Sequence, residues 1–135
     1  MGIKKTIIRK IEKINYKFSK KLIIKNKRII ITGSNSGIGL ELTKKLTSTN
    51  SIISTVNKKK NEVDKIKNKN LKILEEDFQN ENLTENFCYE VNEFKPNIII
   101  NCAAIFGPDE QSLENFHISE FKKILNINFF SPLKL

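Results

Sequence analysis

The chain has 135 residues, a hydrophobic fraction of 39% and a charged fraction of 29%, which excludes a chain disordered by composition and allows one domain with a core. No apolar run approaches the ~20 residues of a membrane-spanning helix. The net charge is +9, but residues 1–28 carry +10 and residues 29–135 carry −1. The basic character therefore belongs to an N-terminal arm. Cys88 and Cys102 make no disulfide framework and favour a reducing, cytoplasmic compartment, and no metal-ligand spacing is present.

The first predicted element is a basic amphipathic helix within residues 1–26. Apolar residues recur there at intervals of three and four, with lysine and arginine at most other positions. They are Ile3, Ile7, Ile11, Ile14, Phe18 and Leu22. Such a helix packs on its own domain or on a second subunit, or it lies on an anionic membrane surface. The interleaved lysines argue against a secretory signal.

A strand, a glycine-rich turn and a helix come next. Arg28–Ile31 is a β-branched run typical of a buried parallel strand, and apolar residues at helical spacing fill Leu40–Leu46. The first N–H groups of a helix have no partner within it and, with the helix dipole, attract a pyrophosphate. Glycine lets the phosphate approach the backbone closely. The sequence therefore predicts a phosphate-binding loop formed by Gly33, Ser34, Asn35, Ser36, Gly37, Ile38 and Gly39.

The remaining elements continue the alternation of strand and helix. Predicted strands cover Ser51–Val56, Leu71–Leu74 and Ile98–Ile100. Predicted helices cover 61–68 and Leu83–Phe94, and a last helix through Phe121, Ile124 and Leu125 is expected to be capped by Ser119. The apolar run Ile98–Ile100 is typical of a strand covered on both faces. This pattern predicts an α/β fold with a doubly wound, Rossmann-like parallel sheet over residues 27–135.

The loop spacing Gly-x-x-x-Gly-x-Gly after Thr32 resembles the cofactor loop of the short-chain dehydrogenase/reductase family. Three further places match this family in order along residues 27–135. They are Asp77 with Phe78 after the third strand, Asn101-Cys102-Ala103-Ala104 after the fourth, and Asn128. Cys102 and Ala104 depart from the family's Asn-Asn-Ala-Gly. The resemblance implies that Asp77 and Phe78 meet adenine, that Asn101 and Ala103 border the cofactor, and that Asn128 helps to hold a proton-relay water.

The resemblance implies an NAD(P)-dependent oxidoreductase that transfers hydride between nicotinamide and a carbonyl or alcohol substrate. It also implies a homo-oligomer at full length and no nucleic-acid partner. The family's catalytic Tyr-x-x-x-Lys is absent after the glycine loop, and Tyr16 and Lys20 precede the loop. We therefore expect a C-terminally truncated, cofactor-binding half that is inactive alone. Alternatives are a non-catalytic dinucleotide-binding module, or a basic protein that binds a membrane or nucleic-acid surface through residues 1–28.

The end of the second predicted strand bears on the choice between NAD and NADP. An NAD site usually places an acidic residue there, about 20 residues beyond the glycines, to bind the ribose hydroxyls. Here the strand is followed by Asn57 and Lys58, and no acidic residue occurs before Glu62. A 2′-phosphate would be attracted by Lys58 or Lys59, so the sequence favours NADP over NAD, with Asn57 and Lys58 at the site.

Overall fold

A four-stranded parallel sheet forms the centre of the molecule. The structure, a computed structural model, describes residues 23–57, 62–108, 112, 114 and 117–135. The strand order is β3-β2-β1-β4. The strands are β1 (Arg28–Ile31), β2 (Ser51–Val56), β3 (Leu71–Glu75) and β4 (Ile98–Ile100). The winding direction reverses between β1 and β4, and in such sheets a crevice opens beside the carboxyl ends of the strands.

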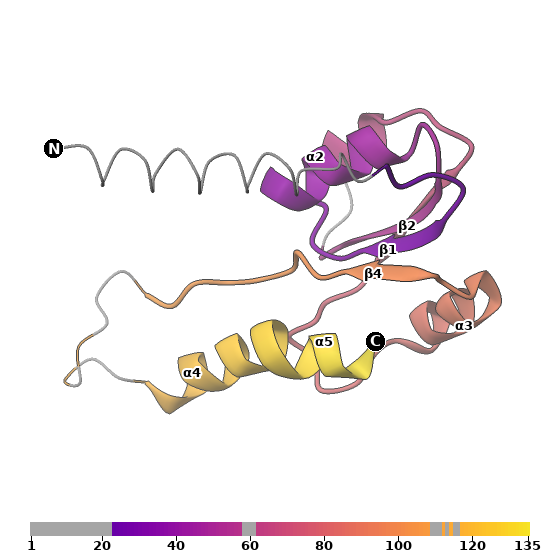
Figure 1. The fold of residues 1–135 in the computed structure, drawn as a ribbon. Helices are drawn as coiled ribbons and strands as arrows, with labels where there is room; N and C mark the ends of the chain where they lie inside the picture. The colour runs from indigo at the N-terminus through magenta and orange to yellow at the C-terminus, as the bar shows by residue number, and fades with distance from the viewer. Residues whose placement is uncertain (1–22, 58–61, 109–111, 113, 115–116) are drawn as a thin grey trace, which may run out of the picture.

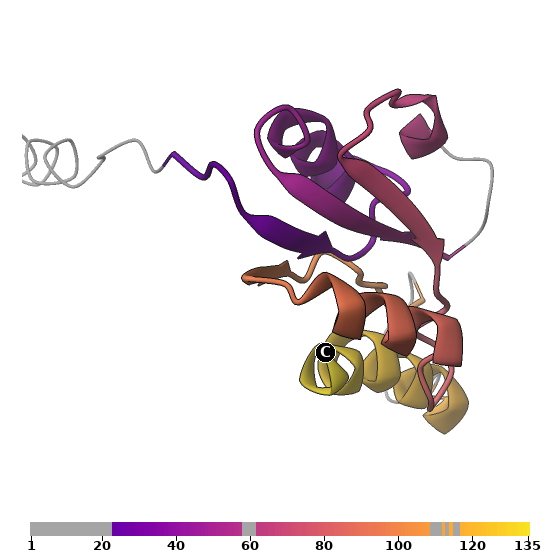
Figure 2. The ribbon, with the colours of Figure 1, turned by 90° about the vertical axis from the view of Figure 1, so that its right-hand side faces the viewer.

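Helices lie on both sides of this sheet (Figures 1 and 2). One side carries α2 (Gly37–Leu46) and the 3-10 turn η1 (Glu62–Lys65). The other side carries α3 and the C-terminal helical segment. These elements are α3 (Glu85–Phe94), α4 (Ile118–Leu125), the π-helix η2 (Asn126–Phe130) and α5 (Ser131–Lys134). The arrangement is the predicted doubly wound α/β fold.

The core divides between the two faces of β1 because successive side chains of a strand point to opposite sides. Ile29 and Ile31 pack toward α2, and Ile30 packs toward α3. All three are 0% exposed. Phe87 completes the α3 side of the core. Burial on both faces explains why β1 reads as an uninterrupted apolar run.

The predicted bounds of β1, β2 and β4 agree with the structure, and β3 is one residue longer. The predicted helix over 61–68 is wrong: within its described part only the 3-10 turn η1 forms, and Val63 and Ile66 pack beside α2. Ser119 is not a helix cap, because α4 begins at Ile118 with His117 at the N-cap position. The predicted arm helix falls on residues 1–22, which lie outside the described residues, and residues 23–26 that follow are not helical.

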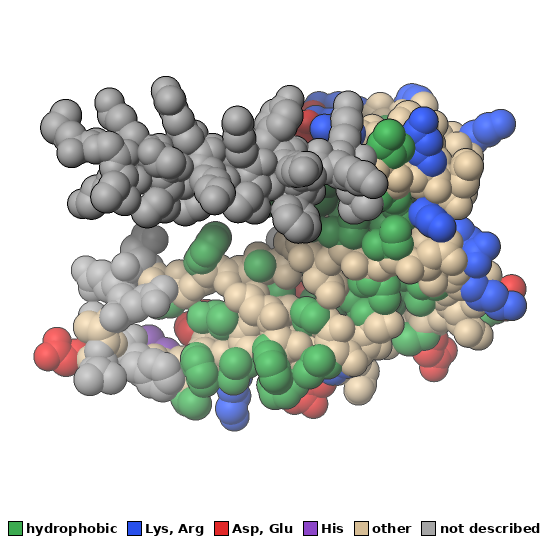
Figure 3. Space-filling model, viewed as in Figure 1, with side chains coloured by type: hydrophobic (Ala, Val, Ile, Leu, Met, Phe, Trp, Pro, Cys, Tyr) green, Lys and Arg blue, Asp and Glu red, His purple; other side chains and the backbone are tan. Residues whose placement is uncertain are grey.

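The predicted cover of β4 is partial: Ile98 and Ile100 pack into the core on the α2 side, and the opposite face of the strand is more open. Ile99 is 37% exposed. Among the described strands, β4 pairs with β1 alone and so forms an edge of the sheet. Figure 3 shows further hydrophobic side chains along the C-terminal helices, and the exposed ones there are Ile118, Phe121, Phe129, Phe130 and Leu133. No described helix is both long enough and apolar enough to cross a membrane.

Candidate functional site

A cleft of about 490 Å³ opens where the carboxyl ends of the strands meet. Its walls come from the glycine loop, the end of β2, the turn after β3, the loop after β4 and η2. The structure thus brings ten predicted site residues together: Gly33, Asn35, Ser36, Gly37, Ile38, Gly39, Asn57, Asp77, Phe78 and Ala103. The cleft also contains residues that local patterns did not single out, among them Thr55, Glu76, Ile105 and Ile127.

Two of the glycines allow the backbone of the loop to pack against its neighbours. A Cβ on Gly33 would lie 2.6 Å from both N and Cα of Ala103, and Gly33 has φ +68°. A Cβ on Gly39 would lie 2.4 Å from the carbonyl oxygen of Gly33. Real Cβ atoms do not approach backbone this closely, so both positions require glycine for packing. The loop is thereby held against the backbone that follows β4.

Gly37 differs, because a Cβ there would meet nothing within 4 Å. Its φ of +55° still disfavours other residues. Ser36 is the N-cap of α2, with φ −159° and ψ −178°, and its side chain makes no capping hydrogen bond. No described side chain caps the amino end of α2, and its first residues, Gly37, Ile38 and Gly39, line the cleft. A helix amino end with uncapped N–H groups and a positive dipole is suited to binding an anion.

Ser34 is turned into the protein and does not line the cleft. It is 0% exposed. Its N–H donates to the Thr55 carbonyl oxygen at 2.9 Å, and its Oγ lies 3.1 Å from Thr43 Oγ1. Thr32 plays a similar part, because its Oγ1 accepts from the backbone N–H groups of Cys102 and Ala103, each at 3.1 Å. These hydroxyls fix the loop from within and leave the binding face to the backbone.

Asn35 and Asn57 form a reciprocal pair across the cleft. Asn35 Nδ2 donates to Asn57 Oδ1 at 2.7 Å, and the Asn57 backbone N–H donates to Asn35 Oδ1 at 3.1 Å. The pair ties the glycine loop to the end of β2. Asn57 Oδ1 accepts one hydrogen bond and retains a second lone pair, and the Nδ2 of Asn57 is a further donor at the cleft. Lys58 lies outside the described residues.

The turn after β3 is held by a buried carboxylate. Glu76 is 2% exposed. Its Oε2 accepts from Thr84 Oγ1 at 2.6 Å, and both of its carboxylate oxygens lie 3.3 Å from the Thr84 backbone N. Asp77 Oδ1 accepts from the N–H of Gln79 at 3.0 Å, and the Phe78 ring packs edge-on against Phe87 with ring centroids 6.1 Å apart. This wall is thus rigidly attached to the start of α3.

Of the two predicted site residues in the loop after β4, one lines the cleft and the other does not. Ala103 lines the cleft, but Asn101 is exposed and borders a separate narrow space beside Ile127 and Ser131. Cys102, which lies between Asn101 and Ala103 in the sequence, also lines the cleft. Burial raises the pKa of the Cys102 thiol, because the thiolate is poorly solvated there.

Asn128 is fastened to the same loop through both ends of its carboxamide. Its Oδ1 accepts from the Ile105 N–H and its Nδ2 donates to the Ile105 carbonyl oxygen, each at 2.9 Å. The side-chain oxygen and the side-chain nitrogen of Asn128 thus each hold the loop after β4 in place. Asn128 lies in η2, and single-turn π-helices occur frequently at functional sites.

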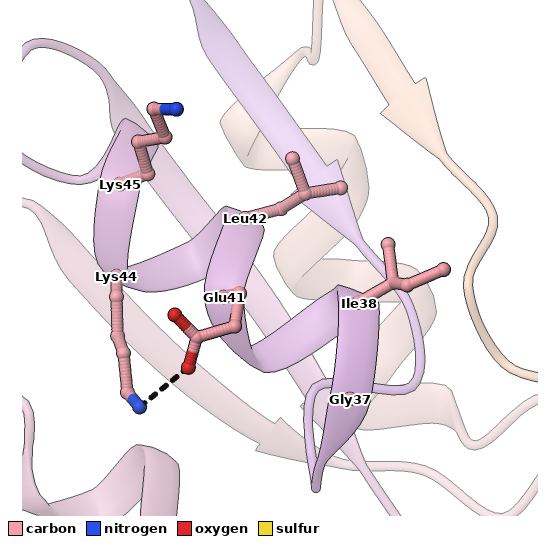
Figure 4. A pocket seen from close by; sticks show the side chains of 6 residues that line it. All are labelled: Gly37, Ile38, Glu41, Leu42, Lys44 and Lys45. Atoms are coloured by element: carbon pink, nitrogen blue, oxygen red, sulfur yellow. Dashed lines mark hydrogen bonds and ion pairs between the residues drawn. The ribbon is translucent and has the colours of Figure 1, made fainter.

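A second hollow lies on the outer face of α2 (Figure 4). Its described lining residues all come from that helix, and Glu41 and Lys44 form an ion pair of 2.7 Å there. Ligand sites usually gather polar groups from several elements, as the cleft does and this hollow does not. No group of three or more His, Cys, Asp or Glu that could hold a metal ion occurs in the part of the chain that the structure describes.

Comparisons with known proteins bear on the same residues. The family model for short chain dehydrogenase matches residues 27–135. No curated protein sequence matches the chain. One similar solved structure, a 4-hydroxyisoleucine dehydrogenase complexed with NADH and succinate, is 27% identical with a TM-score of 0.68, covering 78% of this chain and 46% of that one.

Two other solved structures share the fold at lower identity. A short chain dehydrogenase from Leptospira borgpetersenii with bound NAD⁺ is 23% identical with a TM-score of 0.68, covering 82% of this chain and 43% of that one. The Pseudomonas aeruginosa RhlG/NADP complex is 16% identical with a TM-score of 0.65, covering 82% of this chain and 45% of that one. The chain thus spans about half the length of these structures. With a family match over most of its 135 residues, this chain belongs to the short chain dehydrogenase family.

Proposed function

We propose that residues 27–135 bind a nicotinamide dinucleotide in the cleft, as part of an oxidoreductase that acts on a carbonyl or alcohol substrate. The observation that carries this proposal is the amino end of α2, which begins at Gly37, has no side-chain cap among the described residues and lies at the carboxyl ends of parallel strands. The backbone N–H groups of the glycine loop and α2 would bind the pyrophosphate. When bound, the nicotinamide supplies hydride transfer, and the protein supplies position and electrostatics.

We propose further that Asp77 and Phe78 face the adenine and that Ala103 borders the cofactor near the loop after β4. Asp77 keeps one carboxylate oxygen that no hydrogen bond within its turn uses, and that oxygen can accept from the adenine amino group. Asn128 also acts as a positioning residue through Ile105, and its role in holding a proton-relay water stays a prediction. Ser34 holds the glycine loop through its buried hydrogen bond to Thr43. Asn101 does not line the cleft, and its part in the site is to position the neighbouring backbone that leads to Ala103.

We propose a preference for NADP over NAD. NADH, NAD⁺ and NADP complexes all occur among the similar structures, so the fold alone does not decide. Two features favour NADP: no carboxylate follows β2 before Glu62, and the Asn57 amide offers an N–H donor that a carboxylate would lack. A donor suits a 2′-phosphate, whereas a ribose hydroxyl is best held by a carboxylate. Lys58 follows directly in the sequence and adds a positive charge.

The test is titration of the chain with NADP⁺ and NAD⁺ by microscale thermophoresis, at a protein concentration below the micromolar range in which exposed apolar surface drives association. We expect tighter binding of NADP⁺, and we expect Lys58→Glu and Asn57→Asp each to weaken NADP⁺ more than NAD⁺. Lys69→Glu is the matched control, because Lys69 lies before β3 at the opposite end of the sheet. Equal affinity for the two nucleotides in wild type, with no effect of Lys58→Glu, would overturn the preference. Binding of neither nucleotide would overturn the function.

No Tyr-x-x-x-Lys follows the glycine loop in residues 40–135, so the general acid implied by the family resemblance has no counterpart there. We therefore expect residues 1–135 to bind nucleotide without carbonyl reduction. The remaining parts of the proposal rest on family membership and composition. They are a small carbonyl or alcohol substrate, a homo-oligomer for the full-length protein, a cytoplasmic location, and an arm that contacts a subunit or a membrane surface.

A further inference from the structure

One short helical segment, η2 with the first residue of α5, contacts both walls of the cleft. Asn128 fastens the loop after β4 through Ile105 at 2.9 Å. On the other wall, Asn126 Nδ2 donates to the Gln79 carbonyl oxygen at 3.3 Å, and Ser131 Oγ lies 3.1 Å from the Phe78 carbonyl oxygen. Asn126 and Ser131 are thus 47 and 53 positions away in sequence from the residues that they hold.

The contact on the second wall depends on the π-helical geometry. The backbone N–H of Ser131 donates to the Asn126 carbonyl oxygen, five residues earlier, and Ser131 Oγ lies 2.7 Å from the same oxygen. The wider turn faces Asn126, Asn128 and Ser131 toward the cleft walls from one segment. Ser131 is 3% exposed, and its single hydroxyl proton can be donated to the Asn126 oxygen at 2.7 Å or to the Phe78 oxygen at 3.1 Å.

We propose that Asn126 and Ser131 are positioning residues for the adenine side of the cleft. They fix the backbone of Phe78 and Gln79 and so set where Asp77 stands. The inference rests on the proposed nucleotide function. It assigns an adenine-side role to two residues outside the glycine loop, neither of which touches the pyrophosphate region. Their loss should weaken ligands that contain adenosine and leave binding of a bare pyrophosphate unchanged.

The experiment compares ADP with inorganic pyrophosphate as probes, by microscale thermophoresis on residues 1–135 at a protein concentration below the micromolar range in which exposed apolar surface drives association. For Asn126→Ala and for Ser131→Ala we expect the Kd of ADP to rise roughly 3- to 10-fold, the effect of one hydrogen bond. We expect the Kd of pyrophosphate to stay within twofold. Controls are Asn92→Ala and Ser48→Ala, which remove exposed polar side chains elsewhere on helices or turns.

Amide hydrogen exchange gives a second measurement. The N–H groups of Gln79 and Asn80, which donate to Asp77 at 3.0 and 3.1 Å, should exchange faster in both variants. If the Ser131→Ala variant unfolds, the Asn126→Ala variant still tests the positioning role, because Asn126 is only half-buried and its loss is less damaging to the fold. Unchanged ADP binding, or an equal loss of ADP and pyrophosphate binding, would overturn the positioning role while leaving the proposed function intact. A wild-type chain that binds neither probe would overturn the proposed function itself and the role that rests on it.

Discussion

At the scale of single residues, the three glycines of the loop serve different physical ends. Gly33 and Gly39 are required because backbone atoms occupy the place of a Cβ. Gly37 is favoured by its φ of +55°, and a Cβ there would meet nothing within 4 Å. Replacing a glycine that is needed for packing lowers the free energy of unfolding. Replacing a glycine beside an open anion site chiefly weakens the affinity for the ligand. The two kinds can therefore be separated by mutation.

Gly33→Ala should destabilise the protein strongly, by about 2 kcal/mol or more, because a Cβ would lie 2.6 Å from the Ala103 backbone at a positive φ. Gly37→Ala should cost about 1–2 kcal/mol from the left-handed backbone alone. Urea unfolding measures both. Gly37→Val should also abolish ADP binding, since its branched side chain fills the phosphate space. A Gly37→Val protein that binds ADP normally would show that the loop is only a turn.

Cys102 should react slowly with iodoacetamide at pH 7, and its rate should rise as the pH approaches its raised pKa. The thiolate is the nucleophile, and burial lowers the thiolate fraction at any given pH. Cys88 is exposed and serves as the internal reference in the same protein. Mass spectrometry of both peptides reads the two rates, and ADP should protect Cys102 alone because that residue lines the cleft. Equal rates at pH 7 would contradict the burial argument.

At the scale of elements, α3 and α4 begin in different ways. Thr84 caps α3, and its Oγ1 accepts from the Phe87 N–H at 3.3 Å while donating to the buried Glu76 carboxylate. α4 begins after His117 without a side-chain cap. The start of α3 is therefore hydrogen-bonded to the cleft wall through Glu76, whereas no side chain of the described residues caps the start of α4. The difference matters for stability because buried charge needs its hydrogen-bond donors.

Thr84→Ala should lower the free energy of unfolding by about 2–3 kcal/mol, since it removes a helix cap and leaves a buried carboxylate with one donor fewer. Ser119→Ala is the matched control, because Ser119 is exposed within the first turn of α4 and should change stability by less than about 0.5 kcal/mol. Chemical denaturation of both variants provides the comparison. A large effect of Ser119→Ala would restore it as the cap.

At the scale of the whole molecule, the described residues expose a group of large apolar side chains near the C-terminal end of the chain. β4 is an apolar strand at the edge of the sheet, and the hydrophobic side chains of α4, η2 and α5 lie open beside it (Figure 3). Edge strands of this kind pair readily with other chains. The similar solved structures are about twice as long, with 43% to 46% of their length matched by this chain.

Residues 1–135 should therefore self-associate at roughly 10–100 μM, the range in which exposed apolar surface drives aggregation. Ile99→Lys should reduce the association, because a lysine on an edge strand opposes pairing. Tyr89→Lys adds the same charge on α3, where Tyr89 is 65% exposed, and should have less effect. Sedimentation velocity measures the sizes. A wild-type monomer with a sharp, cooperative melt would contradict this prediction and favour the self-contained binding module.

The sequence by itself determined the elements whose signals are local. The bounds of β1, β2 and β4 follow from short β-branched runs, and the glycine loop follows from the spacing of Gly33, Gly37 and Gly39 between a strand and a helix. The alternation of these elements was enough to predict the parallel, doubly wound sheet. Local periodicity failed at residues 61–68, where packing of Val63 against α2 outweighs helix propensity.

Only the tertiary structure decided which candidate side chains face the cleft. It turns Ser34 inward, keeps Asn101 off the wall, and pairs Asn35 with Asn57 across 22 positions of sequence. It also commits the Asn128 carboxamide to Ile105, 23 positions away. Such contacts depend on how distant segments approach one another in space, and neither residue type nor local spacing encodes that distance. A sequence therefore nominates polar residues near a site, and the packed strands and turns select the ones that form it.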